Sequence, residues 1–158
     1  MWPPTPEIGI DLNDLALGVP WIDELAPRVA ARLDVNLPPV VGHGDWWSNN
    51  IRWREGHVTA VDDWDSVVAL PEAAIVGVAA ALFNEGESTL EQSVVFLDAY
   101  TRATRRLEDT ASRQVAWASG LWARLVDAKK GMALGLTANA HALRDQASDR
   151  AWRAGVST

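Results

Sequence analysis

The segment from residue 51 to residue 61 limits the fold most, because it predicts two short strands joined by a tight turn. Apolar and polar residues alternate in Ile51–Arg54, Glu55-Gly56 is a turn pair, and His57–Val61 continues beyond the turn. This pattern is typical of an antiparallel β-hairpin. The two ends of a hairpin lie side by side, so Asn50 should lie close to the aspartates that follow residue 61.

Helical periodicity dominates most of the remaining chain. From Pro20, apolar residues recur at three- and four-residue steps as far as Leu33, and Ser88 with Glu91 three residues later predicts a capping box at the start of another helix. Further helical patterns cover residues 71–83, 111–130 and 138–153. We therefore expect a mostly α, α+β fold, in which a helical bundle carries one small β-hairpin.

The domain organisation follows from length and proline content. A proline-rich stretch at the beginning predicts an extended lead-in over residues 1–17. Residues 18–158 are long enough to form a single domain with its own core and show no internal repeat.

Composition excludes several classes of function. The chain has no cysteine, which rules out disulfides and thiolate metal sites. Its net charge of −7 and pI of about 4.8 disfavour nucleic acid as a partner. No run approaches the roughly 18 apolar residues of a membrane helix, and the first residues lack the layout of a signal peptide. We expect a cytoplasmic protein that binds neither nucleic acid nor membrane.

The stretch HGDWWSNN, residues 43–50, collects hydrogen-bonding side chains just before the hairpin. Asn50 at the hairpin entrance and an aspartate at its exit would present two hard oxygens to one cation, which suits Mg²⁺ on a nucleotide. Asp45 would lie beside the cation, where its carboxylate can accept the proton of an attacking hydroxyl. His43 is better placed to hydrogen-bond the backbone of this loop than to take part in the reaction.

The longer stretch HGDWWSNNIRWREGHVTAVDDWD resembles the catalytic stretch of the aminoglycoside phosphotransferase and choline kinase family, small-molecule kinases with a protein-kinase-like fold. The resemblance implies that Asp45 is the catalytic residue and that Asn50 and Asp63 are the metal ligands. His43 joins Asn50 and Asp63 in the predicted cofactor site. It further implies a fold like the C-terminal lobe of those kinases, Mg²⁺ with ATP or GTP as co-substrate, and a small, amine-bearing, aminoglycoside-like acceptor with a hydroxyl group.

The sequence departs from the family pattern at several positions. Asp62 stands where the family usually has an apolar residue, so Asp62 remains an alternative to Asp63 as metal ligand. Ala74 stands where the family commonly has an aspartate that supports the catalytic loop. Only 42 residues precede His43, and the two lysines of the chain, Lys129 and Lys130, lie in a late helical segment. The nucleotide-binding N-terminal lobe and its strand lysine therefore have no counterpart in this sequence.

Two functional interpretations remain open. The chain is either the catalytic lobe of a small-molecule kinase, or an inactive single-lobe remnant that binds a ligand or a partner. Either would expose a face that a second lobe normally covers, so we expect a homodimer or a separate N-lobe partner. The sequence does not indicate which carboxylates face the acceptor; the candidates are Glu85, Glu87, Asp98, Asp127 and Asp145.

Overall fold

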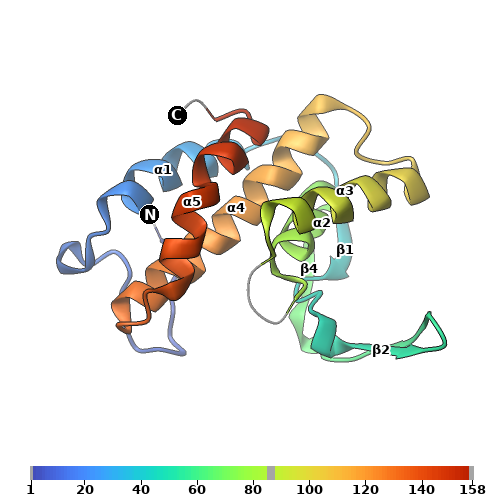
Figure 1. Ribbon diagram of the computed structural model, residues 1–158, viewed down its shortest axis with the longest axis horizontal. Helices are drawn as coiled ribbons and strands as arrows, with labels where there is room; N and C mark the ends of the chain where they lie inside the picture. The colour runs from blue at the N-terminus through green and yellow to red at the C-terminus, as the bar shows by residue number, and fades with distance from the viewer. Residues whose placement is uncertain (1, 85–87, 157–158) are drawn as a thin grey trace.

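The computed structural model describes residues 2–84 and 88–156, and it shows a helical body with a hairpin that projects from it (Figure 1). The α-helices are α1 (Pro20–Ala30), α2 (Glu72–Leu82), α3 (Leu90–Thr104), α4 (Thr110–Ala133) and α5 (Ala138–Arg153). The strands are β1 (Pro39–His43), β2 (Ile51–Arg54), β3 (His57–Val61) and β4 (Val67–Pro71). Three short 3₁₀ helices in the described ranges are η1 (Leu15–Leu17), η2 (Ser48–Asn50) and η3 (Trp64–Ser66). The mostly helical α+β class is thus confirmed.

The core forms around α4, which packs against α1, α2 and α5. Leu121 and Leu125 of α4 are fully buried, as are Ile22 of α1 and Leu143 of α5. The crossing of α2 with α4 is close because both helices place a glycine there, Gly77 in α2 and Gly120 in α4, and neither position has room for a side chain. This close crossing fixes α2, which follows β4 directly in the chain.

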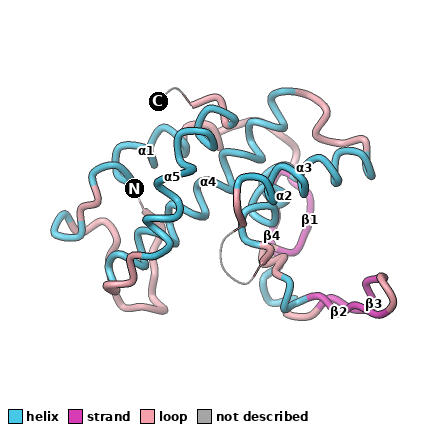
Figure 2. The backbone as a smooth tube through the Cα atoms, viewed as in Figure 1, coloured by secondary structure: helices cyan, strands magenta, loops and turns pink. Residues whose placement is uncertain are grey.

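The strands form two separate antiparallel pairs within the described residues, where we expected a single hairpin. β2 pairs with β3 as predicted, around a turn in which Glu55 and Gly56 have φ of 50° and 79°. The additional pair joins β1 to β4, with His43 opposite Val67 and Pro39 opposite Pro71 (Figure 2). The prediction that one hairpin alone carries the catalytic loop is therefore wrong, because the loop runs from one strand pair to the other.

The capping box of α3 lies one residue later than predicted. Thr89, not Ser88, is the N-cap: its hydroxyl accepts a hydrogen bond from Gln92 N (3.2 Å), and its own N–H donates to Gln92 Oε1 (2.8 Å). Ser88 is buried, and its carbonyl accepts hydrogen bonds from the buried side chains of Arg124 (3.0 Å) and Arg150 (2.8 Å). Burial and these contacts leave Ser88 outside the helix.

The beginning of the chain differs from the extended lead-in that we expected. Residues 2–17 pass through several turns, and Trp2 and Leu12 are buried in the core. Trp2 stacks on Trp122, with ring centroids 5.5 Å apart, and its indole N–H donates to Asp23 (3.1 Å). The Lys129 ammonium also binds Asp23 at 2.7 Å, so this segment is fastened to α1 and α4. Within the described ranges, no helix has the length and apolar character needed to cross a bilayer.

Candidate active site

The candidate site lies in the gap between the two strand pairs. The loop 44–50 leaves β1 and enters β2, while the segment 62–66 leaves β3 and enters β4. Two backbone hydrogen bonds bridge the segments, from Gly44 N to Ser66 O (2.8 Å) and from Asp62 N to Asn50 O (2.8 Å). The loop with the predicted catalytic residue thus runs beside the segment with the predicted metal ligand, as the two ladders require.

His43 holds the two segments together from below the surface. It is buried, and its Nε2 donates to the carbonyl of Asp62 (2.9 Å) while its Nδ1 accepts from the N–H of Asp45 (3.2 Å). These two bonds assign the tautomer with the proton on Nε2. The ring also meets Trp64 edge to face, with centroids 5.1 Å apart. His43 therefore bonds the backbone, the role we expected, and it positions Asp45 relative to the segment 62–66.

Asn50 and Asp45 are in direct contact. The Asn50 side-chain N–H₂ donates to both the carbonyl and the carboxylate Oδ2 of Asp45, at 3.0 Å each. This bond fixes the orientation of the carboxylate, and it turns the Asn50 Oδ1 away from Asp45. The amide oxygen is the atom of Asn50 that can bind a cation.

Asp62 and Asp63 have different surroundings, although they are adjacent. The Asp62 carboxylate accepts a hydrogen bond from Arg52 Nε at 2.6 Å. Asp63 lies in the left-handed region, with φ 64° and ψ 47°, a conformation that aspartate tolerates better than most residues. The pKa of the Asp63 carboxyl is raised, first by a hydrogen-bonding interaction with Asp65 and by the charge of Asp65, and then by burial and the charge of Asp45. Asp62 has a cationic partner, whereas Asp63 is next to other acids.

The surroundings of Asp63 are acidic. Three carboxylates, those of Asp45, Asp63 and Asp65, interact closely enough to raise the pKa of one of them, so negative charge accumulates there. In residues 2–84 and 88–156, no group of three or more His, Asp or Glu side chains lies in an arrangement that could hold a metal ion. A cation bound by Asn50 and Asp63 would therefore complete its shell with water and phosphate oxygens, as Mg²⁺ commonly does.

The catalytic loop has a support that the sequence did not reveal. Ala74 lacks the carboxylate that the family commonly uses there, but the loop is tied to the end of α2 in another way. Ser48 N donates to Phe83 O (2.9 Å), and the Trp47 indole N–H donates to Asn84 O (2.8 Å). These bonds, together with His43, hold the loop at both ends.

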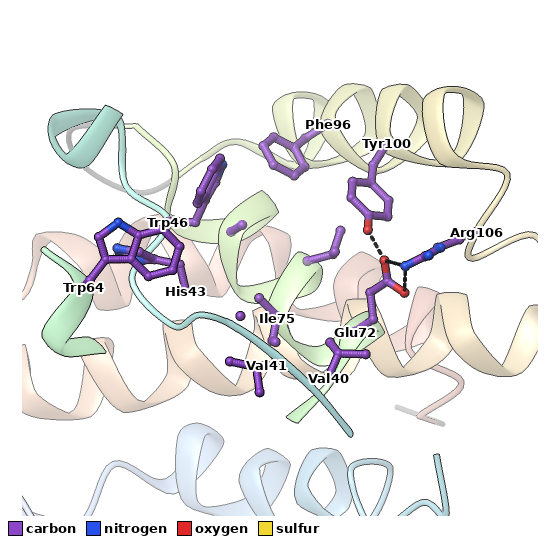
Figure 3. Close-up of a pocket in the computed structure, with 13 residues that line it drawn as sticks. Val40, Val41, His43, Trp46, Trp64, Glu72, Ile75, Phe96, Tyr100 and Arg106 are labelled. Carbon is purple, nitrogen blue, oxygen red and sulfur yellow. Dashed lines mark hydrogen bonds and ion pairs between the residues drawn. The ribbon is translucent and has the colours of Figure 1, made fainter. Parts of the chain in front are cut away.

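A second cluster near the site was missed by the sequence reasoning. Tyr100 of α3 donates its hydroxyl proton to Glu72 at the start of α2, and Arg106 binds both oxygens of the same carboxylate at 2.8 Å (Figure 3). Burial acts to raise the pKa of Glu72, but the hydrogen bonds from Tyr100 and Arg106 outweigh it and lower that pKa. Tyr100 and Arg106 lie 28 and 34 positions after Glu72 in the sequence, so no local sequence pattern predicts these contacts.

The described candidates for acceptor carboxylates have different surroundings. Asp98 pairs with Arg113 at 2.6 Å, burial raises the pKa of Asp127, and Asp145 is exposed on α5. Glu85 and Glu87 lie outside the described residues. Both lysines are engaged elsewhere, Lys129 with Asp23 and Lys130 with Glu7.

Comparison with known proteins bears on the identity of this site. A family model described as APH, Phosphotransferase enzyme family, matches residues 2–117, which include both loops of the candidate site and the first three α-helices. Searches of the curated proteins and of the solved structures gave no match.

Proposed function

The chain belongs to the APH phosphotransferase enzyme family, and on this premise we propose that its site transfers the γ-phosphoryl group of ATP or GTP to a hydroxyl of a small molecule. The observation that carries the proposal is the contact of the Asn50 amide with the Asp45 carboxylate, beside the segment that contains Asp63. A fixed carboxylate next to two oxygen ligands is what phosphoryl transfer to a hydroxyl requires.

In the proposed reaction, the acceptor oxygen attacks the γ-phosphorus as Asp45 accepts the hydroxyl proton. The bond from the γ-phosphorus to the bridging oxygen breaks, and the nucleoside diphosphate leaves with that oxygen. The hydrogen bond from Asn50 holds the Asp45 carboxylate in its orientation. The loop itself is anchored by two further hydrogen bonds, from Asp45 N to His43 Nδ1 and from the Trp47 indole N–H to Asn84 O.

Asn50 Oδ1 and the Asp63 carboxylate would hold Mg²⁺, which would supply positive charge to the phosphate oxygens. We assign the second ligand to Asp63 and not to Asp62, because Arg52 already binds the Asp62 carboxylate at 2.6 Å. Crowding by Asp65 and Asp45 supports the assignment, since a cation relieves repulsion among carboxylates.

Calorimetry of Mg²⁺-ATP binding tests the proposal with two neighbouring variants. Asp63→Asn removes one charge and keeps a side chain that tolerates the left-handed conformation, so the fold is preserved. We expect this variant to lose binding, while Asp62→Asn, the matched control, keeps most of it. Equal loss in both variants would refute the choice of Asp63. Absence of binding heat at millimolar nucleotide would refute a nucleotide site in this chain.

A second function, binding of a ligand or partner without transfer, is favoured by one observation. Lys129 and Lys130, the two lysines of the sequence, are both in ion pairs with N-terminal residues and not at the site. A kinase normally directs a lysine to the nucleotide phosphates. Steady-state transfer assays separate the two functions: wild-type turnover that Asp45→Asn abolishes, with nucleotide binding retained, supports the kinase, and binding without any turnover supports the alternative.

A further inference from the structure

A cavity of about 430 Å³ opens beside the catalytic loop, between β1, α2 and α3 (Figure 3). One end is aromatic, formed by Trp46, Trp64 and His43. Trp46 follows Asp45 directly in the sequence and Trp64 follows Asp63, so this end adjoins both segments of the proposed site. The volume is within the usual range for small-molecule sites, roughly 300–1,000 Å³.

The walls of the cavity are apolar along its length. β1 contributes Val40 and Val41, α2 contributes Ile75 and Ala79, and α3 contributes Phe96. Figure 3 shows Val41, Ile75 and Phe96 between the aromatic end and the far end. A ligand in this space would contact hydrocarbon and aromatic surfaces, which favour apolar groups and leave charged groups without partners.

The far end carries charge that is already neutralised. Glu72 is the acidic residue that lines the described cavity, and Arg106 binds both of its oxygens at 2.8 Å while Tyr100 donates a third hydrogen bond. The charges of Glu72 and Arg106 cancel. Burial, followed by the contact with Glu72, raises the pKa of Tyr100 to about 12, so its hydroxyl is uncharged at neutral pH. Among the described residues that line the cavity, a polycationic ligand would therefore find no carboxylate without a partner.

We propose that this cavity binds the phosphoryl acceptor, and that the acceptor is an alcohol with an uncharged, apolar body. This rests on the proposed function and replaces the expectation of a cationic, aminoglycoside-like acceptor. The hydroxyl group would lie at the Trp46 and Trp64 end, beside the loop that contains Asp45, and the apolar body would extend along Ile75 and Phe96 toward Tyr100. Bound in this way, the acceptor keeps its hydroxyl near the carboxylate that takes the proton.

Indole N–H signals in ¹H–¹⁵N NMR spectra provide the test, with 2-(2-naphthyl)ethanol as the apolar probe and kanamycin as the polycationic one. Trp46→Phe and Trp64→Phe assign the two cavity signals. Val41→Glu places a charge at the cavity, and Val95→Glu is the matched control on α3, away from it. Both valines are exposed, at 78% and 64%, so neither substitution disturbs the core.

We expect naphthylethanol to shift the Trp46 and Trp64 signals and to leave the exposed Trp152 signal unchanged. Val41→Glu should weaken binding about tenfold, since a carboxylate beside an apolar ligand loses its hydration, and Val95→Glu should not. Shifts with kanamycin but not with naphthylethanol would overturn the proposed acceptor class. No shift with either probe, or equal weakening by both glutamates, would overturn the cavity as the binding site. The calorimetry of Mg²⁺-ATP binding is an independent measurement. If Mg²⁺-ATP binds and Asp63→Asn abolishes that binding, but naphthylethanol shifts neither signal, the acceptor proposal is refuted and the proposed function is not.

Discussion

Replacing Gly77 with alanine tests whether the α2–α4 crossing fixes the position of the site. A Cβ at this position would lie 1.9 Å from the carbonyl oxygen of Ala116 and 2.3 Å from Ser119 Oγ. In a helix, alanine normally gains about 1 kcal/mol over glycine. Here the nearest atom belongs to the backbone of α4 and can move only with the helix, and overpacking of this kind costs about 1–3 kcal/mol or more.

We therefore expect Gly77→Ala to lower the free energy of unfolding by about 2 kcal/mol, which for a domain of this size lowers Tm by about 4–8 °C. Urea denaturation followed by circular dichroism at 222 nm measures the change, and the midpoint should fall at constant m-value. Gly120→Ala should act in the same direction and more weakly, because its Cβ would lie 2.6 Å from Gly77 O.

Ala142→Gly measures how much the difference in helix propensity between alanine and glycine contributes to the stability of this protein. Ala142 is exposed on α5, so this change should cost about 1 kcal/mol without any steric effect. If Gly77→Ala is as stable as the wild type, or more stable, the close approach of the two helices is refuted. Because α2 follows β4 directly, a displaced α2 should also weaken Mg²⁺-ATP binding at the segment 62–66.

Three further outcomes follow from the charges and the exposed surface. Because the pKa of Asp63 is raised in the fold, the folded state holds this proton more tightly than the unfolded state, and stability falls as pH rises from 3.8 through the raised value. Asp63→Asn should thus raise the Tm of the metal-free protein at neutral pH. MgCl₂ should raise the Tm of the wild type more than that of the variant, and thermal melts with and without MgCl₂ measure both effects. The lowered pKa of Glu72 contributes stability that is present above its usual value of 4.5 and is lost as pH falls through the pKa of the folded state. In Glu72→Gln, the urea midpoint should therefore depend less on pH in the acid range than it does in the wild type, and an unchanged dependence would contradict this. Val41 and Val67 are apolar and exposed at 78% and 48%, and they lie on the same face of the β1–β4 pair, because Val41 is opposite Ala69 and Val67 is opposite His43. We propose that two copies associate through this face; sedimentation velocity should show a concentration-dependent dimer that Val67→Lys disperses, and a wild-type monomer at high micromolar concentration would refute it.

Local patterns were sufficient to predict most of the fold. The helical periodicities located all five α-helices in the described residues, with ends that differ by a few residues, and the turn pair Glu55-Gly56 located the β2–β3 hairpin. The β1–β4 pair was missed because its strands lie 24 positions apart in the sequence at their closest paired residues, His43 and Val67, with no shared turn. The cap of α3 was misplaced because Ser88 and Thr89 both qualify as N-caps, and burial of Ser88 decides between them.

Part of the site was also predictable from local patterns. The hairpin geometry correctly placed Asn50 beside Asp62, and the motif placed Asp45 five residues before Asn50. The metal-binding roles of Asn50 and Asp63 stay predictions. The rest of the site depends on contacts between residues far apart in the sequence. The hydrogen bond from Trp47 to Asn84, for example, depends on how α2 packs, and a single sequence contains no signal for it.

The turn at the tip of the β2–β3 hairpin lies at the end of its ladder opposite Asn50 and Asp62. The ladder between them spans about four residues, or roughly 13 Å. A change at Glu55 or Gly56 should therefore leave the positions of the carboxylates at the candidate site unaltered. This tip is therefore a suitable attachment point for a fluorophore or an affinity peptide, and a homologous chain would tolerate insertions there without any change in chemistry.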